Sequence, residues 1–463
     1  MRKINLRRIE EGLLPRIVHI DLEPDLGKIK VRFEEPDEEL FQEVKEKLEH
    51  LFASLRIRGG GEMWNRVMMV PEGLGTRSDV FLRFVKYEDN LLEHFRTNPC
   101  YQEGAYVLRC VGKSSHSDNS LNSEEAVGHS NGTDEKPASR LFIEPADVTD
   151  KLHVGLKWIQ GELKQNRNLR GRLEIRFGRK LWHSLPKEVL EKEMNLVELE
   201  GLLDSKARHN GMNTSIDGLK VDSLLRELEN HCNQKPHVIE IYDFNVTLPT
   251  SCDPRMKADV RVIAKEDDTL EVIRVKKNGT KAITIDVLCV QRHHDCRLDL
   301  SYYELMHKHD FEYSCVKLVD SMSITEPGSV GFQPCTDMWK VNLLRYARRY
   351  TYVLEETFLI TISEVKEYKV DWESYGRENK GQLLTVNWEA LAGHWELELN
   401  NILWECTFAE AIGQSPEEAL SIYMKHPSVD AAVLHPLAPE SLISHQDLQN
   451  VLQNVEWLIE QLE

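Results

Sequence analysis

The residues whose types could bind a metal lie close together in His293-His294-Asp295-Cys296, with Cys289 upstream and His307 and His309 downstream. Zinc takes about four convergent Cys, His or carboxylate ligands, and paired spacings such as Cys-x-x-Cys make such a site recognisable in a sequence. This cluster has no standard spacing. A polar loop between two strands of a sheet explains it as simply. We therefore predict no metal site, and leave metal binding by His293, His294 and Cys296 as the alternative.

Motifs of known catalytic chemistry are missing from the sequence. It has no P-loop, no Rossmann glycine pattern, no nucleophile elbow and no zincin helix. Gly59-Gly60-Gly61 could approach a phosphate if it opened a helix, but the residues after it are typical of a strand. We interpret these glycines as a flexible turn. The sequence thus predicts no catalytic residue, no cofactor and no enzymatic activity.

The most basic part of the chain is the segment from Leu156 to Trp182. Polar and apolar residues alternate in Arg172–Phe177, which predicts a half-buried strand that ends at Gly178. Three interpretations remain open: a solvated sheet face with charge pairs, a docking face for an acidic partner or an acidic segment of the same chain, and an RNA-binding face in which arginines contact phosphates and aromatic rings stack on bases. The candidate contact residues are Arg167, Arg170, Arg172, Arg176, Arg179, Lys180 and Trp182.

A second candidate contact surface is the C-terminal helix, expected from about Gln446 to Leu462. Its apolar residues recur at helical spacing and form one stripe. Packing on its own domain is the first interpretation, and insertion into the groove of a partner is the second. The residues of this stripe offered as a partner contact are Leu448, Val451, Leu452, Val455 and Leu458.

The elements that must position these residues are predicted from hydrophobic periodicity. Asp217 caps a helix that contains Val221, Leu224 and Leu228. Asn278-Gly279 predicts a hairpin between two strands. Other strands are expected at 242–248, 259–264, 297–303 and 351–365, and helices at 338–350 and 387–401. Together they predict an antiparallel sheet flanked by helices.

Composition restricts the class of protein. With 463 residues and a net charge of −19, the whole surface is unsuited to non-specific binding of nucleic acid or anionic membrane. Nine cysteines without tight spacing are typical of a reducing compartment. No apolar run reaches the roughly 20 residues of a membrane helix. We expect no membrane partner and a cytoplasmic or nuclear location, with the mitochondrion less favoured because Glu10, Glu11 and Pro15 interrupt the basic N-terminus.

The predicted fold class is α+β, with a small N-terminal α/β unit and a larger region built on an antiparallel sheet. Residues 1–113 form the first domain, and 114–140, rich in Ser, Asn and Gly, form a disordered linker. Residues 141–365 form the central domain, and 366–463 are helical and strand segments packed on it.

The segment Lys157–Trp182, with its RLEIRFGRKLW sequence, resembles an uncharacterised fungal family with K-homology-like α/β modules. The stretches Tyr350–Ile362 and Leu383–Leu391 are similar to the C-terminal part of that family. The resemblance implies a non-enzymatic protein with K-homology-like folds that binds RNA. This sequence departs from the Gly-x-x-Gly loop of such modules, since Glu62 stands three residues after Gly59.

From these observations we expect a non-catalytic binding or scaffold subunit of an intracellular complex, with protein partners and an unspecified oligomeric state. An RNA-binding K-homology-like protein that uses the arginine-rich strand is the alternative. An enzyme with an unrecognised site is the third hypothesis.

Overall fold

The structure, a computed structural model, describes residues 18–23, 28–33, 63–71, 81–88, 91–112, 139–141, 169–195, 198–199, 210–247, 257–264, 270–305, 322–326, 329–332, 340–355, 357–370, 388–390, 393–402 and 445–463. Arg167, Gly59–Gly61, His307, His309 and most of the predicted linker 114–140 lie outside these ranges. The predicted K-homology-like unit therefore stays a prediction.

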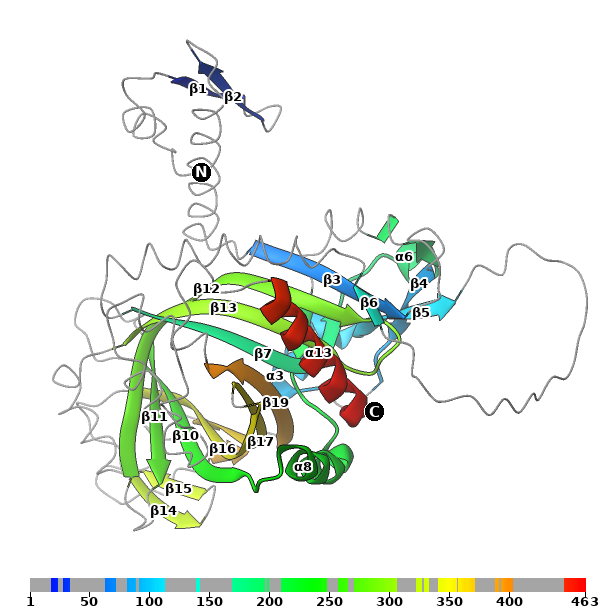
Figure 1. The fold of residues 1–463 in the computed structure, drawn as a ribbon. Coiled ribbons are helices and arrows are strands. Elements are labelled where there is room, and N and C mark those ends of the chain that lie inside the picture. Colours follow the sequence, from blue (N-terminus) through cyan, green and yellow to red (C-terminus); the bar gives the residue numbers. More distant parts are fainter. Residues whose placement is uncertain are drawn as a thin grey trace, which may run out of the picture.

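Eight antiparallel strands form a closed ring, in the order β12-β11-β10-β16-β17-β19-β7-β13 and back to β12. Figure 1 shows β12, β13 and β7 crossing above the steeper β10, β11, β16 and β17. The bounds are β7 Leu169–Trp182, β10 His237–Thr247, β11 Lys257–Ala264, β12 Leu270–Cys289, β13 Asp295–Leu305, β16 Lys340–Leu354, β17 Phe358–Val370 and β19 His394–Asn401. Closure leaves the ring without a free edge.

The apolar core of the ring lies on its outer face. Because side chains alternate along a strand, Leu173, Ile175 and Phe177 of β7 point outward while Arg172, Glu174 and Arg176 line the interior. Strand β19 repeats this arrangement, with Leu397 and Leu399 outside. The outward positions of β7, β12, β13, β16, β17 and β19 belong to one large buried cluster.

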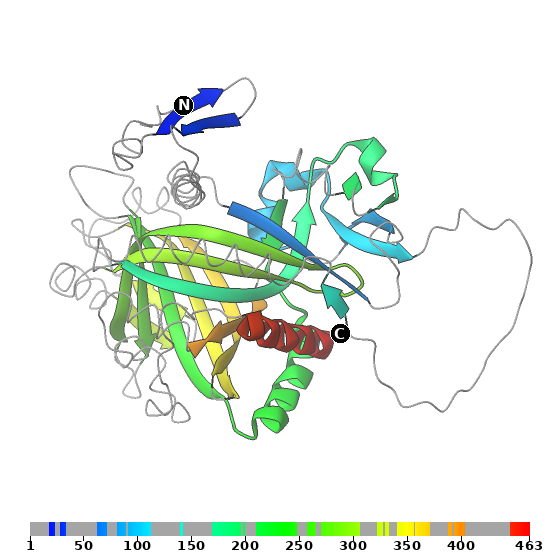
Figure 2. The ribbon, with the colours of Figure 1, turned by 45° about the horizontal axis from the view of Figure 1, so that its top comes forward.

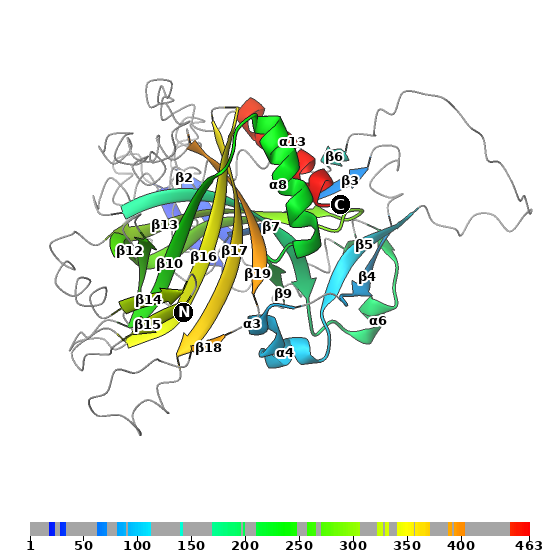
Figure 3. The ribbon, with the colours of Figure 1, turned by 90° about the horizontal axis from the view of Figure 1, so that it is seen from below.

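Two amphipathic helices cover this outer face, α8 (Gly218–Cys232) and α13 (His445–Leu462). Figures 2 and 3 show them side by side against the ring. Asp217 caps α8 by accepting a hydrogen bond from the Leu219 amide, as predicted. Both predicted helices are confirmed. The His231 and Trp457 rings, 4.6 Å apart between centroids, join the two helices.

Shorter elements extend the sheet beyond the ring. β4 pairs with β5 and β8, β9 pairs with the end of β7, β3 pairs in parallel with β12, β6 pairs with β3, and β18 pairs with β17. Their bounds are β3 Met63–Pro71, β4 Phe81–Lys86, β5 Tyr106–Gly112, β6 Ser139–Leu141, β8 Met194–Asn195, β9 Asn210–Asn213 and β18 Trp388–Ala390. The helices here are α3 Glu93–Arg96, α4 Pro99–Gln102 and α6 Lys187–Leu190.

Two further pairs of strands complete the described elements: β1 Val18–Glu23 with β2 Lys28–Phe33, and β14 Met322–Glu326 with β15 Ser329–Phe332. The molecule is thus a sheet-rich α+β protein, which confirms the coarse fold class. Among the described helices, none is long and apolar enough to cross a membrane.

Several local predictions are wrong. The strand expected at 351–365 is divided between β16, which ends at Leu354, and β17, which begins at Phe358, and the strand expected to end at Gly178 continues to Trp182. Asn278-Gly279 makes no hairpin, because β12 runs through both residues and pairs with β13 on either side of a bulge. The helix predicted at 338–350 is most of β16, and the one predicted at 387–401 contains β18 and β19. In each case pairing with distant strands outweighs local propensity.

Candidate functional site: the interior of the ring

The ring encloses a cavity of about 460 Å³. Small closed rings of eight strands either fill their interior with side chains or hold one small ligand. Here the lining is almost entirely charged or polar. It includes Arg172, Glu174, Arg176, Asp243, Asn245, Asp259, Arg261, Lys276, Arg345, Arg349, Glu367, His394, Glu396 and Glu398.

Four of these residues are arginines that lie close enough to repel one another: Arg172, Arg261, Arg345 and Arg349. Arg261 donates two hydrogen bonds of 2.6 Å to the Asp243 carboxylate. Burial alone would lower the pKa of Arg261, but Asp243 raises it against the like charges of Arg172 and Arg345. The cavity lining as a whole carries six cationic side chains and six carboxylates, and within it these four arginines form one group.

Arg349 is the member of this group without an ion pair to a carboxylate among the described residues, although the charges of Glu398 and Asp243 act to raise its pKa. Its Nε is buried without a hydrogen-bond partner in the described part of the chain. Burial, and then the charge of Arg261, lower the pKa of the Arg349 guanidinium to about 10. A half-buried cation held beside other cations is unfavourable unless an anion joins it. The arrangement is therefore suited to a bound anion.

Strand β19 supplies the acidic and amide groups of the site. Arg345 donates to Glu396, and His394 Nε2 lies 3.0 Å from the other oxygen of that carboxylate. Burial opposes ionisation, but Arg345 and His394 lower the pKa of Glu396 to about 2. Glu398 Oε2 and Asn400 Oδ1 are buried and have no hydrogen-bond partner among the residues described. Glu398 Oε2 lies 4.0 Å from Arg172 Nη2, so its charge is paired with one of the interior arginines.

One end of the interior is filled by ion pairs. Lys180 Nζ lies 2.5 Å from Asp286 Oδ2, and Arg297 Nε lies 2.6 Å from the other oxygen. Burial opposes ionisation of Asp286, but Lys180 and Arg297 lower its pKa. The exposed fraction of the side chain along β7 falls from 29% at Arg176 to 0% at Lys180. The cavity is therefore open to solvent near Arg176, and along β7 it is closed at Lys180.

The basic segment predicted from the sequence divides between the two faces of β7. Arg172 and Arg176 line the interior, Lys180 fills its closed end, and Arg179 is buried on the outer face. Trp182 packs edge-on against Phe84 in a separate small core. Arg170 lies in β7, but its side chain is not among those described.

The predicted partner helix packs on the ring. Val451, Val455 and Leu458 are fully buried in the main core and Leu452 nearly so, while the Leu448 side chain lies outside the described set. The residues of the metal-like cluster lie in two different places. His293 and His294 line an outer pocket, whereas Cys289 and Cys296 are buried in the core. No three His, Cys, Asp or Glu residues gather as metal ligands within the described ranges.

Sequence reasoning missed half of the site. Arg345 and Arg349 lie in the helix that was predicted at 338–350, and Glu396 and Glu398 lie in the one that was predicted at 387–401, but both segments are strands. The signal for β19 was present, since His394-Trp-Glu-Leu-Glu-Leu-Asn400 alternates like Arg172–Phe177. β16 carries no such alternation, because Leu343-Leu344 and Arg348-Arg349 interrupt it.

No protein-family model matches the sequence, and no curated protein matches it. Solved structures of RNA triphosphatases do match. The S. pombe Pct1 RNA triphosphatase in complex with the Spt5 CTD is 14% identical over 67% of this chain and 94% of that chain, with a TM-score of 0.36. The Mimivirus capping enzyme triphosphatase is 13% identical over 68% and 97%, with a TM-score of 0.29. The prediction of a non-catalytic scaffold subunit that is not an enzyme is wrong by this comparison, because these neighbours are enzymes.

Proposed function

We propose that the interior of the ring binds a chain of phosphates and hydrolyses its terminal phosphate. The observation that carries this proposal is the group formed by Arg172, Arg261, Arg345 and Arg349, in which Arg349 Nε has no partner within the described ranges. A planar guanidinium binds phosphate oxygens through two parallel hydrogen bonds. Several such groups on facing strands suit a ligand with several linked phosphates.

Arginines in this position would also promote the chemistry. Hydrolysis adds water to the terminal phosphorus, breaks the bridging P–O bond and releases phosphate and the shortened chain. Negative charge shifts onto the oxygens of the transferred and leaving groups, where fixed cations stabilise it. Glu398, a carboxylate of the cavity lining, is the residue that we assign to orient the attacking water through its Oε1.

Phosphate chains carry Mg²⁺, which proteins hold through one or two carboxylates together with the phosphates themselves. Glu398 Oε2 and Asn400 Oδ1 are oxygen donors of the type that Mg²⁺ takes, and they stand two residues apart on one face of β19. They would hold such an ion. The structural neighbours are RNA triphosphatases, whose reaction belongs to the same class, and RNA with a 5′-triphosphate is therefore the first polymer to test.

The test is release of inorganic phosphate from tripolyphosphate, with and without Mg²⁺, by the full chain. We expect Arg349→Met and Glu398→Gln each to lower the rate by about 100-fold, the usual cost of one preorganised group. Lys187→Met is the matched control, because Lys187 is exposed on α6 and should leave the rate unchanged. Binding of tripolyphosphate is measured in parallel by calorimetry. Failure of the wild-type chain both to bind and to hydrolyse it would reject the proposal.

A further inference from the structure

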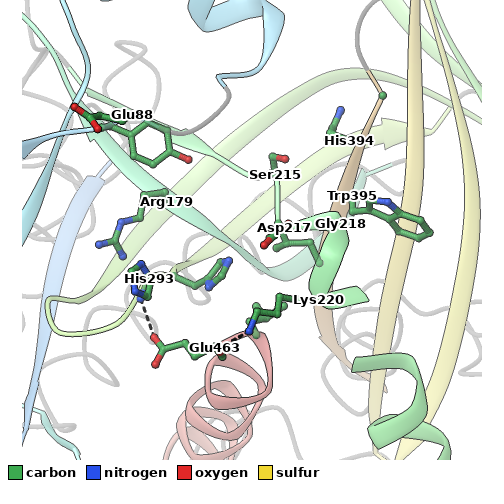
Figure 4. A pocket seen from close by; sticks show the side chains of 15 residues that line it. Glu88, Arg179, Ser215, Asp217, Gly218, Lys220, His293, His394, Trp395 and Glu463 are labelled. Carbon is green, nitrogen blue, oxygen red and sulfur yellow. Dashed lines mark hydrogen bonds between the residues drawn. The ribbon is translucent and has the colours of Figure 1, made fainter. Parts of the chain in front are cut away.

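A second cavity, the outer pocket, lies outside the ring and has a volume of about 810 Å³. It is formed where β7, the turn between β12 and β13, the first turn of α8 and the last turn of α13 meet. Figure 4 shows Arg179 and His293 on one side of it and Asp217, Gly218 and Lys220 on the other, with Glu463 between them. The volume is in the range of small-molecule sites.

Two buried side chains in this pocket have nitrogen atoms without a hydrogen-bond partner among the described residues. Arg179 is 3% exposed, and only its Nη1 is engaged, by the Arg292 carbonyl at 2.7 Å and by Asp295 at 3.6 Å. Arg179 Nε and Nη2 and His294 Nδ1 have no hydrogen-bond partner within the part of the chain that is described. His294 is 8% exposed. Leaving such groups unsatisfied is costly. The two Arg179 nitrogens can only donate and so indicate a missing acceptor, whereas His294 Nδ1 donates to an acceptor when the ring is protonated.

The start of α8 adds further donors. The first amides of a helix have no acceptor within the helix, and they favour an anion. The Asp217 carboxylate accepts the amide of Leu219 at 3.0 Å and the Asp217 carbonyl accepts that of Lys220 at 3.1 Å, which leaves the amide of Gly218 as the donor of this turn. The Trp395 ring lies against Gly218, where a Cβ would come within 3.1 Å of Cδ1. The pocket therefore combines an apolar aromatic wall with several inward donors.

The acidic residues of the pocket are already engaged or solvated. The Glu463 carboxylate accepts hydrogen bonds of 2.8 Å from Arg292 Nη1 and from the His293 amide. Asp217 is the helix cap, and Glu88 is exposed. None of them supplies the acceptor that Arg179 and His294 lack.

We propose that the outer pocket binds an oxyanion, a phosphate or carboxylate group of a small molecule, through Arg179 and His294 at the first turn of α8. This site is separate from the interior of the ring and does not depend on the function proposed there. An anion beside the His294 ring would also favour its protonated form and raise its pKa, which burial and then Arg179 now lower to about 4.

The test follows the NMR signals of isotope-labelled histidines in the full chain. Inorganic phosphate and, separately, acetate are added at constant pH and ionic strength. Loss of a signal in His294→Gln assigns that signal to His294. We expect phosphate or acetate to shift the His294 signal saturably, and the stronger of the two identifies the class of anion. Arg179→Met should weaken that binding at least tenfold.

Two further variants keep the result interpretable. Arg179→Lys retains the charge and removes the guanidinium fork, so it should also weaken binding if Arg179→Met does not fold. Arg349→Met, inside the ring, should leave the His294 titration unchanged. If neither anion moves the His294 signal in the wild-type chain, or if Arg349→Met abolishes the shift, the outer pocket is not an oxyanion site.

Discussion

At the scale of single residues, Arg349 and Arg261 are a natural contrast. Both are interior arginines, but Arg261 is bound to Asp243 through two hydrogen bonds and Arg349 Nε has no partner within the described part. A charged side chain that is retained for ligand binding and has no ion pair in the free protein lowers the free energy of unfolding. The two side chains should therefore respond in opposite ways to removal of the charge.

We expect Arg349→Met to leave the free energy of unfolding unchanged or to raise it by about 1 kcal/mol, because it removes a repelled, partly buried cation. Arg261→Met should lower it by about 1–3 kcal/mol, because Asp243, which is partly buried, would lose two hydrogen bonds from a charged group. Urea denaturation of both variants measures the difference. A loss of stability in Arg349→Met equal to that in Arg261→Met would show that Arg349 has a structural partner.

Glu396 gives the interior a defined response to acid. The pKa of its carboxyl is lowered to about 2 in the folded chain, against an ordinary value of 4.5. A carboxyl with a lowered folded pKa stabilises the fold above its unfolded pKa, and this stabilisation is lost as the pH falls toward the folded pKa.

The wild-type chain should consequently lose on the order of 3 kcal/mol of stability through Glu396 between about pH 4.5 and pH 2. The Glu396→Gln variant, which cannot titrate, should show a shallower decline over that interval. The free energy of unfolding measured as a function of pH checks this. Parallel curves for the two proteins would mean that Glu396 is not held by Arg345 and His394.

At the scale of elements, β7 connects the ring to the smaller sheet through Gly178. The sequence predicted that the strand ends at this glycine, whereas it continues to Trp182 and pairs with β9. A Cβ on residue 178 would lie 2.0 Å from the Asn213 carbonyl oxygen. Glycine therefore serves close packing of two segments here and does not terminate the strand.

We expect Gly178→Ala to lower the free energy of unfolding by roughly 1–3 kcal/mol and to displace β9, since the clash is with backbone. Gly393→Ala is the control, because its Cβ would meet the Val365 carbonyl oxygen only at 3.4 Å, an ordinary contact. Hydrogen exchange of the Asn210–Asn213 amides would report the displacement. Unchanged protection in Gly178→Ala would contradict it.

The α13 helix offers a similar test of packing on the ring. Leu458 is fully buried in the main core, while Gln453 is exposed on the same helix. Leu458→Ala should cost about 2–5 kcal/mol, and Gln453→Ala should be within the range of surface changes, about 0.5 kcal/mol. Thermal denaturation of the two variants distinguishes a packed helix from one reserved for a partner, for which both changes would be neutral.

These elements also show what the sequence could predict. The α8 and α13 helices and the strand from Arg172 to Phe177 carry complete local patterns, and each was predicted. β16 was not, because its charged interior face and its helix-favouring Leu, Arg and Ala residues are explained only by pairing with β10 and β17. Ring closure joins β7 to β19, more than 200 residues apart, and no local pattern indicates it.

At the scale of the whole molecule, the ring differs from a simple globular core, because its charged side chains face inward and its apolar side chains face outward. The ring is charged inside, and its apolar face is outside beneath α8 and α13. The candidate site follows from this arrangement, since its arginines come from β7, β11 and β16. Arg172 could be nominated from the sequence, but its convergence with Arg349 required the closed ring.

This arrangement predicts how the whole fold responds to a ligand. A polyanion that binds the interior arginines of the folded chain, and not the unfolded chain, stabilises the fold by about 2.7 kcal/mol at 100 times its dissociation constant. Tripolyphosphate should therefore raise the melting temperature in proportion to the logarithm of its concentration. Added salt should reduce this increase in melting temperature only slightly, because salt screens the charges of a buried site less than it screens surface charges.

Inorganic chloride at matched ionic strength should not produce this increase, and the Arg349→Met variant should reduce it to the part that the outer pocket contributes. A net charge of −19 makes the contrast sharp, because the outer surface as a whole repels polyanions and cannot produce a non-specific stabilisation. Equal melting temperatures with and without tripolyphosphate would mean that the interior cations are balanced by the chain itself, and that the ring holds no anion.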